Sequence, residues 1–324
     1  MIMITIKPFG KDYMLYTLEN AKGMKVGITD LGATIQSISV KNKSGGFTDV
    51  VLGYDTPEEY LSNEGFVGSF IGRYANRIGG ACFELDGVEY KLCANDGENT
   101  LHGGNGYDRR RLHASADESG VTFSIHDPDG ENGFPGNVDA SVRYELTDDN
   151  TLIIKYSAVS DKNTVLCLTN HSYFNLHGEG NILSQNLRIA ADGYLPVDDK
   201  LIPTGEIREV EGTEFDFREM RKVGSTMYDH CFVLDGSGLC AEMYDEESGI
   251  DMTVYTDMPA VQLYCGGSLT NRKGKGGAVY DKGSALCLET QFYPDSPNKP
   301  EFPSAVLKAN QHFESRTSLK FEVK

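Results

Sequence analysis

The sequence predicts a large all-β protein in which antiparallel strands stack as a sandwich. Apolar and polar residues alternate along many segments, helical signals are scarce, and 36 glycines recur between the alternating segments. Alternation with a period of two is typical of half-buried strands, and glycine suits the tight turns between them. At 324 residues the chain can bury a sizeable core, and we expect residues 1–324 to form a single domain.

The strand signals follow one another along the chain. Residues 121–125 alternate first. Residues 140–146 and 152–158 alternate next, and the turn-rich tetrad 147–150 joins them, so this pair predicts an antiparallel hairpin. Further strands are predicted at 252–255, 261–265, 285–290 and 319–323.

One short helix is predicted after residue 56. Thr56 suits the N-cap, Pro57 suits the first helical position, and Glu59 completes a capping box with Thr56. The glycine- and lysine-rich stretch 271–277 lacks the full phosphate-loop pattern and precedes no helix, so we expect a flexible surface loop there. Many strands and so little helix favour the sandwich.

The composition restricts the partners. The net charge of −18 disfavours nucleic acids and anionic membranes but not a neutral ligand. No apolar run is long enough to span a membrane, and we expect no signal peptide. Seven cysteines without a C-x-x-C pair favour reduced, buried thiols in a cytoplasmic protein and argue against a cysteine zinc site. No segment is an obvious apolar interface, so we expect a monomer.

Polar residues interrupt apolar runs at several places, and these are the candidates for chemistry. A buried arginine must be paired or must face a ligand, and for Arg73 we expect a structural salt bridge. For His102, which precedes two glycines, an exposed turn and a ligand site with open space over the backbone remain equal alternatives. His171 lies in a dense polar segment, and histidine exchanges protons readily near neutral pH.

Two carboxylates complete this set. Asp229 precedes an apolar strand and could accept hydrogen bonds from neighbouring sugar hydroxyls. Glu289 interrupts a strongly apolar strand. If its side chain points inward, burial should raise its proton affinity and suit it as a general base, and the alternative is an outward, solvated glutamate. His102 and His171 lack the spacing of a helical metal site and no third ligand stands out, so we expect no metal.

Taken together, these segments resemble the aldose epimerase, or galactose mutarotase, family over nearly the whole chain. The resemblance is carried, in this order, by residues 31–38, 49–54, 72–78, 99–104, 129–137, 169–176, 194–197, 201–206, 228–230, 261–264, 289–291 and 294–298. Any one segment is weak, but their joint order is specific.

The resemblance implies a β-supersandwich with an open cleft on a concave sheet face, a small aldose as substrate and no cofactor. It implies that Glu289 is the general base, that His171 is the general acid and that His102 binds and polarises the sugar. The positions that hold sugar hydroxyls would be Asn76, Arg77, Asp229 and Gln262. For this chemistry we expect Glu289 to be an anion at neutral pH and His171 to have a pKa near the operating pH.

Two alternatives remain open. One is a related epimerase of hexose 6-phosphates, which would need a cationic pocket. The other is a non-catalytic sugar-binding sandwich, which would have lost residues of the catalytic set. Phe292 replaces a histidine found in many relatives, which we expect to affect the shape of the cleft, and the basic residues Arg109–Arg111 have no assigned role.

Overall fold

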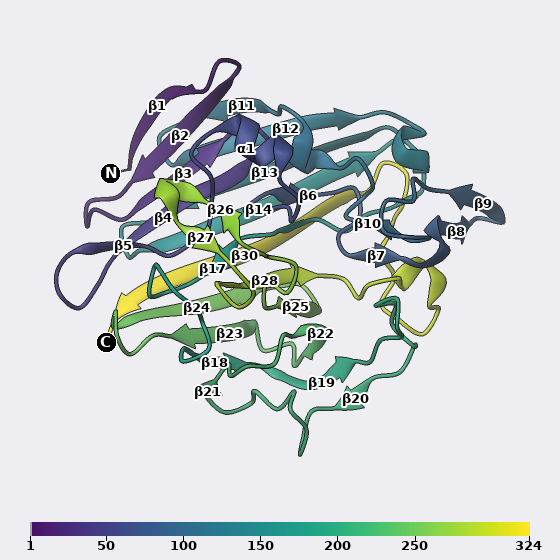
Figure 1. The fold of residues 1–324 in the computed structure, drawn as a ribbon. Helices are drawn as coiled ribbons and strands as arrows, with labels where there is room; N and C mark the ends of the chain where they lie inside the picture. Colours follow the sequence, from purple (N-terminus) through teal and green to yellow (C-terminus); the bar gives the residue numbers. More distant parts are fainter. Residues whose placement is uncertain (1) are drawn as a thin grey trace.

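The computed structural model describes residues 2–324, and its regular structure is almost all β-strand (Figure 1). Within that range the one α-helix is α1 (Pro57–Ser62). It begins with the predicted capping box, in which the Glu59 N–H donates to the Thr56 hydroxyl and the Thr56 N–H donates to the Glu59 carboxylate. No helix among these residues is long and apolar enough to cross a membrane.

The largest sheet has nine strands, all paired antiparallel. In spatial order they are β11 (His113–Ala116), β12 (Gly120–Asp127), β13 (Val138–Leu146), β14 (Thr151–Ser160), β30 (His312–Val323), β24 (Ile250–Thr256), β23 (Leu239–Tyr244), β18 (Asn186–Ile189) and β21 (Arg221–Lys222). The predicted hairpin is confirmed, because β13 and β14 pair with Ala140 opposite Ala158.

A second, six-stranded antiparallel sheet carries the features that matter for function. Its order is β17 (Tyr173–Phe174), β28 (Leu286–Gln291), β25 (Ala260–Tyr264), β22 (Asp229–Leu234), β19 (Ala191–Leu195) and β20 (Arg208–Glu209). A third sheet of five strands contains β1 (Met3–Phe9), β2 (Tyr13–Glu19), β3 (Lys25–Thr29), β4 (Thr34–Lys41) and β5 (Phe47–Asp49). It packs over the nine-stranded sheet, where the ring of Tyr16 on β2 lies edge-on to Phe123 on β12 at 5.4 Å.

Short two-stranded pairs complete the fold and connect the sheets. They are β6 (Phe70–Ile71) with β16 (Thr169–Asn170), β7 (Arg77–Ile78) with β10 (Thr100–Leu101), β8 (Cys82–Leu85) with β9 (Val88–Lys91), β15 (Thr164–Val165) with β29 (Val306–Leu307), and β26 (Arg272–Lys273) with β27 (Val279–Tyr280). The last pair contradicts the predicted flexible loop at 271–277, because that stretch folds into a hairpin. The Lys275 ammonium anchors it, 2.7 Å from the Gln36 carbonyl and 2.7 Å from the Asp49 carboxylate.

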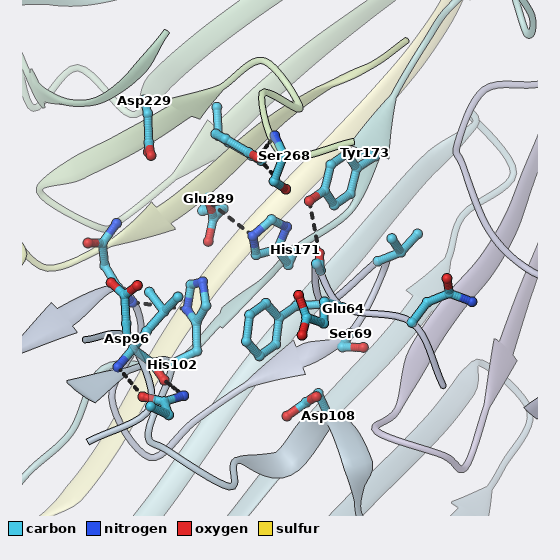
Figure 2. Close-up of a pocket in the computed structure, with 18 of the residues that line it drawn as sticks. Glu64, Ser69, Asp96, His102, Asp108, His171, Tyr173, Asp229, Ser268 and Glu289 are labelled. Atoms are coloured by element: carbon cyan, nitrogen blue, oxygen red, sulfur yellow. Dashed lines mark hydrogen bonds and ion pairs between the residues drawn. The ribbon is translucent and has the colours of Figure 1, made fainter. Parts of the chain in front are cut away.

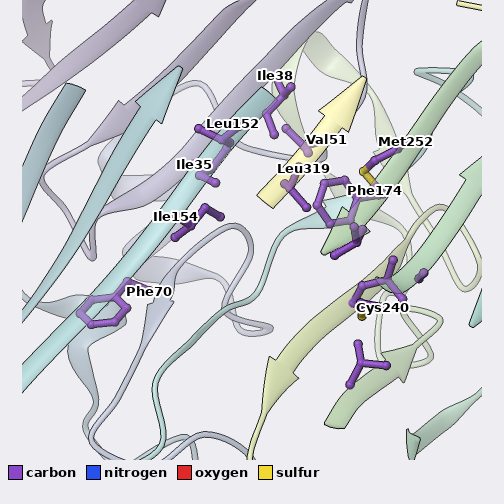
Figure 3. Close-up of a cluster of buried hydrophobic side chains, with 14 of the residues drawn as sticks. Ile35, Ile38, Val51, Phe70, Leu152, Ile154, Phe174, Cys240, Met252 and Leu319 are labelled. Carbon is purple, nitrogen blue, oxygen red and sulfur yellow. The ribbon is translucent and has the colours of Figure 1, made fainter. Parts of the chain in front are cut away.

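One continuous apolar core joins the three large sheets (Figure 3). It includes Ile38 from β4, Leu152 and Ile154 from β14, Leu319 from β30 and Phe174 from β17. On β28, Leu286 and Leu288 also enter this core. Because side chains alternate across a strand, the odd-numbered residues of β28 must face the opposite side of the six-stranded sheet. That side carries the candidate site.

Candidate active site

A cavity of about 840 Å³ opens on the face of the six-stranded sheet that points away from the core (Figure 2). Six of the seven residues predicted for the site line it, namely Asn76, Arg77, His102, His171, Asp229 and Glu289. They come from distant parts of the chain, and the small pairs β6–β16 and β7–β10 hold their segments beside β28. Asp229 and Asp108 lie at opposite ends of the view in Figure 2, with His171 and Glu289 between them.

Glu289 is the most buried carboxylate of the cavity, at 2% exposure. Its Oε1 lies 3.6 Å from Nε2 of His171, and its Oε2 has no hydrogen-bond partner among the described residues. Burial, together with the neighbouring charge of Asp229, raises the pKa of Glu289 well above its ordinary value, and the Arg77 guanidinium opposes this only in part. The predicted rise in proton affinity is therefore confirmed.

His171 lies between β16 and β17 with its ring edges turned toward β28. Its ring stacks on Tyr173, with centroids 5.1 Å apart, and on Phe66 at 6.0 Å. Its Nδ1 lies 3.4 Å from the Cys287 thiol. Burial lowers the pKa of His171 to about 4, because a cation in this apolar surrounding loses its hydration.

His102 follows β10 and is buried, so the alternative of an exposed turn is wrong. The backbone N–H of Asn76 donates to its Nδ1 at 3.1 Å, which places the ring proton on Nε2. Burial, assisted by His171 and Arg77, lowers the pKa of His102 well below its ordinary value. Gly104 lines the cavity beside His102, whereas a Cβ at Gly103 would lie 2.6 Å from the backbone nitrogen of Arg73. Here glycine permits close backbone packing.

Asn76 and Arg77 come from the turn that enters β7. Asn76 has a left-handed backbone, with φ of 62°, and its side-chain oxygen accepts the Arg77 N–H at 2.8 Å. The Arg77 guanidinium donates to the Asp96 carboxylate at 2.7 Å. Asp96 thereby holds the arginine at the cavity wall as an oriented donor.

Asp229 and Gln262 lie on the neighbouring strands β22 and β25. The Gln262 amide donates to the Asp229 carboxylate at 2.6 Å, and burial raises the pKa of Asp229. Asp229 lines the cavity, whereas Gln262 is 4% exposed and is not part of the cavity wall. Gln262 lies directly opposite Glu289 across β25 and β28 and so faces the same side of the sheet, and its Oε1 has no hydrogen-bond partner among the described residues.

Burial opposes the charged states of both members of the expected acid–base pair. Glu289 was expected to be an anion at neutral pH and His171 to titrate near the operating pH. Burial instead favours the uncharged form of both groups, with the Glu289 pKa raised and the His171 pKa near 4. The physical reason is the lack of compensation, since the 3.6 Å between Oε1 and Nε2 is too long for a hydrogen bond.

The three groups can also be tested as a metal site. His102, His171 and Glu289 each offer one ligand atom, and these atoms lie within 4.8 Å of one another, so the structure supplies the third ligand that the sequence did not indicate. However, a metal-bound imidazole nitrogen needs a free lone pair. Since Nδ1 of His102 accepts a backbone N–H, its Nε2 carries the proton and is a hydrogen-bond donor. The trio therefore fits a polar ligand better than a cation.

Several cavity residues were missed from the sequence. Phe66, whose ring lies 4.6 Å from that of His102, follows a glycine and has no polar signal. Others are Tyr54, Tyr60, Ser69, Asp96, Asp108, Met227, Tyr264 and Ser268. The apolar surround raises the pKa of Asp108 to about 6. Arg77 was predicted from the sequence to be a site residue. A search for the carboxylate that accepts its hydrogen bond could therefore have found Asp96.

The structure shows where the basic segment Arg109–Arg111 and Phe292 lie. In the basic segment, Arg109 lines the cavity, while Arg110 and Arg111 form ion pairs with Asp127 and Asp30. Phe292 is not part of the cavity wall; it packs near Phe313, with ring centroids 6.4 Å apart. The expectation that Phe292 shapes the cleft is therefore wrong, because the residue turns into the protein after β28 ends.

Known proteins resemble this chain over almost its full length. A family model described as aldose 1-epimerase matches residues 14–320. The galactose mutarotase of Bos taurus is 44% identical over 314 residues, which cover 93% of this chain and 92% of the relative. The aldose 1-epimerase of Escherichia coli (strain K12) is 38% identical over 336 residues, which cover 98% and 97%.

Solved structures agree with the sequence comparisons. A GalM/aldose epimerase homologue from C. elegans has a TM-score of 0.90 at 30% identity and covers 100% of this chain and 99% of its own. The galactose 1-epimerase of Lactobacillus acidophilus NCFM has a TM-score of 0.85 at 31% identity and covers 100% and 98%. The predicted β-supersandwich is confirmed, and the chain belongs to the aldose 1-epimerase family.

Proposed function

We propose that this chain, an isomerase of the aldose 1-epimerase family, interconverts the α and β anomers of free aldohexoses such as galactose and glucose. The observation that carries the proposal is the facing pair of Glu289 and His171, 3.6 Å apart in the cavity wall, with one carboxylate oxygen that none of residues 2–324 binds. A sugar hydroxyl is a suitable donor for that oxygen.

The pair can move one proton in each direction. The anomeric hydroxyl donates to Glu289 and favours its carboxylate form, because hydrogen bonds to the charged form lower a pKa. The carboxyl proton passes to Nε2 of His171, and His171 delivers it to the ring oxygen. The bond between C1 and the ring oxygen breaks, the anomeric proton goes to Glu289, and C1 becomes a carbonyl. After rotation about the C1–C2 bond, the same steps in reverse close the ring on the other face.

The remaining residues bind and orient the sugar in this proposal. His102 donates from Nε2, Arg77 donates from a guanidinium that Asp96 orients, and Asp229 accepts hydroxyl hydrogens. Asn76 lines the cavity beside Arg77. Gln262 holds the Asp229 carboxylate in place through its amide. No cofactor or metal takes part in these steps.

The charges of the cavity support a neutral substrate. Its wall contains the acidic residues Glu64, Asp96, Asp108, Asp229 and Glu289 but only two arginines, and Arg77 is already paired with Asp96. A dianionic phosphate needs converging cationic donors. The free sugar is therefore favoured over hexose 6-phosphate.

Polarimetry of freshly dissolved sugars tests the proposal. Fresh α-galactose and α-glucose should approach equilibrium faster with the protein than in buffer, while glucose 6-phosphate should equilibrate at the buffer rate. An exposed-carboxylate variant, Glu84→Gln on β8, serves as a control that should match the wild-type rate. Equal rates with and without protein for every free aldose would sink the proposal and leave a sugar-binding sandwich. Faster turnover of the phosphate would reassign the substrate.

The cellular compartment, the domain organisation and the oligomeric state are also part of the proposal. All seven cysteines are unpaired, and five of them are buried, which supports a reducing, cytoplasmic compartment. The continuous core shared by the three large sheets supports a single domain over residues 1–324. We keep the monomer as the expected state.

A further inference from the structure

One strand faces both ring nitrogens of His171. Glu289 and Cys287 are two residues apart on β28 and therefore point to the same side of the sheet. Glu289 Oε1 lies 3.6 Å from Nε2, and Cys287 Sγ lies 3.4 Å from Nδ1. A proton that moves at Nε2 changes the basicity of the whole ring, so the partner of Nδ1 matters for the reaction.

The two histidines of the cavity differ at this atom. Nδ1 of His102 accepts a backbone N–H, which can only donate. Protonation of His102 at Nδ1 would set two donors against each other, so His102 is restricted to the neutral state. The partner of Nδ1 in His171 is a thiol, which can both donate and accept.

We propose that Cys287 is a positioning residue for His171, whose thiol serves Nδ1 in both protonation states of the ring. In the neutral ring that takes the proton at Nε2, the remaining hydrogen is on Nδ1, and the sulfur accepts it. In the imidazolium Nδ1 still carries hydrogen, and the sulfur accepts from a charged donor. The thiol keeps its own hydrogen throughout. This role rests on the proposed function only in making His171 the proton carrier.

Among the described residues, the Cys287 thiol is the side chain that contacts Nδ1 of His171, and a hydrogen bond with the backbone of His171 itself also favours the charged ring. The other titratable or charged groups that face the ring or its partners come from several elements: His102, Tyr173, Tyr264, Glu289, Asp229 and Arg77. The aromatic rings pack on the faces and edge of the imidazole. Burial raises the pKa of the Cys287 thiol well above its ordinary value, so the hydrogen remains on sulfur at working pH.

Substitutions at Cys287 separate the role from simple packing. Cys287→Ser keeps a group that donates and accepts, whereas Cys287→Val fills the space with methyl groups that do neither. Cys240→Ser and Cys240→Val are the matched controls, because Cys240 is equally buried but lies on β23 in the main core. Cys287→Ala replaces the valine variant if that chain does not fold.

Two measurements are made on each folded variant. NMR titration of isotope-labelled histidine, without sugar, reports the pKa of His171. It should fall in Cys287→Val, because the cation loses an acceptor, and stay at or above the wild-type value in Cys287→Ser. Polarimetry with galactose should give a kcat at least about tenfold lower for valine, as for other outer partners of functional histidines. Serine should stay within about threefold, with KM little changed in both.

The outcomes distinguish a role of Cys287 as the partner of His171 from a simple packing effect. Equal His171 pKa and kcat values for Cys287→Val, Cys287→Ser and the wild type would overturn the role of Cys287. So would a loss of kcat in Cys240→Val as large as in Cys287→Val, since that is a packing effect. If the protein proved not to be a mutarotase, the sugar-free titration would still report whether Cys287 governs His171.

Discussion

Two buried charged residues show opposite solutions to the same physical problem. Arg73 is 1% exposed, and its guanidinium donates to the Asp127 carboxylate at 2.8 Å and to the Pro135 carbonyl at 2.7 Å, among further acceptors. Glu289 is 2% exposed, and its Oε2 has no partner among the described residues. Burial of a charge is costly unless it is paired and hydrogen-bonded.

The difference separates structure from function. Arg73 is saturated, so it holds together the segments around Asp127, as the sequence predicted. Glu289 instead keeps hydrogen-bonding capacity in the wall of a cavity and has a raised pKa. A buried ionisable group that still has a free hydrogen-bonding atom can bind a ligand. A buried group whose hydrogen bonds are all made within the protein stabilises the fold instead.

The largest effect is expected when either member of the reactive pair, Glu289 or His171, is replaced. Glu289→Gln and His171→Asn should each lower kcat for galactose anomerisation by about 10³-fold, the scale of general acid–base catalysis, while the fold stays intact. Polarimetry measures the rate, and circular dichroism checks the fold. Near-normal rates in both variants would refute the assigned roles.

The second test removes the partner of Arg73. Asp127→Asn should lower the free energy of unfolding by about 3 kcal/mol, because an uncompensated guanidinium remains buried. Urea denaturation measures this loss, and the kcat of the molecules that remain folded should be unchanged. A variant as stable as the wild type would show that Arg73 does not need its carboxylate.

The smallest effect concerns the stability cost of Glu289 itself. Its folded-state pKa is raised, so above the ordinary pKa of a glutamate the unfolded chain loses its proton while the folded chain retains it, and stability falls as pH rises. Glu289→Gln should therefore be more stable than the wild type at pH 8, by on the order of 1 kcal/mol, the size of one pKa unit.

The same comparison at about pH 3, below the ordinary glutamate pKa of about 4.3, should show almost no difference, because both states of the wild type are then protonated. Thermal or urea unfolding at the two pH values measures it, with Glu84→Gln as the exposed control. A stability difference that does not change with pH would mean that Glu289 is ionised in the folded protein.

The secondary structure was largely predictable because its signals are local. The hairpin of β13 and β14 follows from alternation and a turn, and the cap of α1 follows from Thr56 and Glu59. The failures concern placement. Phe292 turns away from the cavity, because register and bends decide which side of a strand end meets the cleft. Phe66 gave no signal, since an apolar residue after a glycine is common.

By itself the sequence determined the all-β architecture, the family and the polar residues that interrupt apolar strands. It could do so because alternation, turn chemistry and residue type are properties of short segments. Only the tertiary structure decided which of these residues are saturated, which pKa values burial shifts, and that His171 meets a thiol on β28. Those properties depend on desolvation and on partners far apart in the chain, such as His171 and Cys287, which are 116 positions apart.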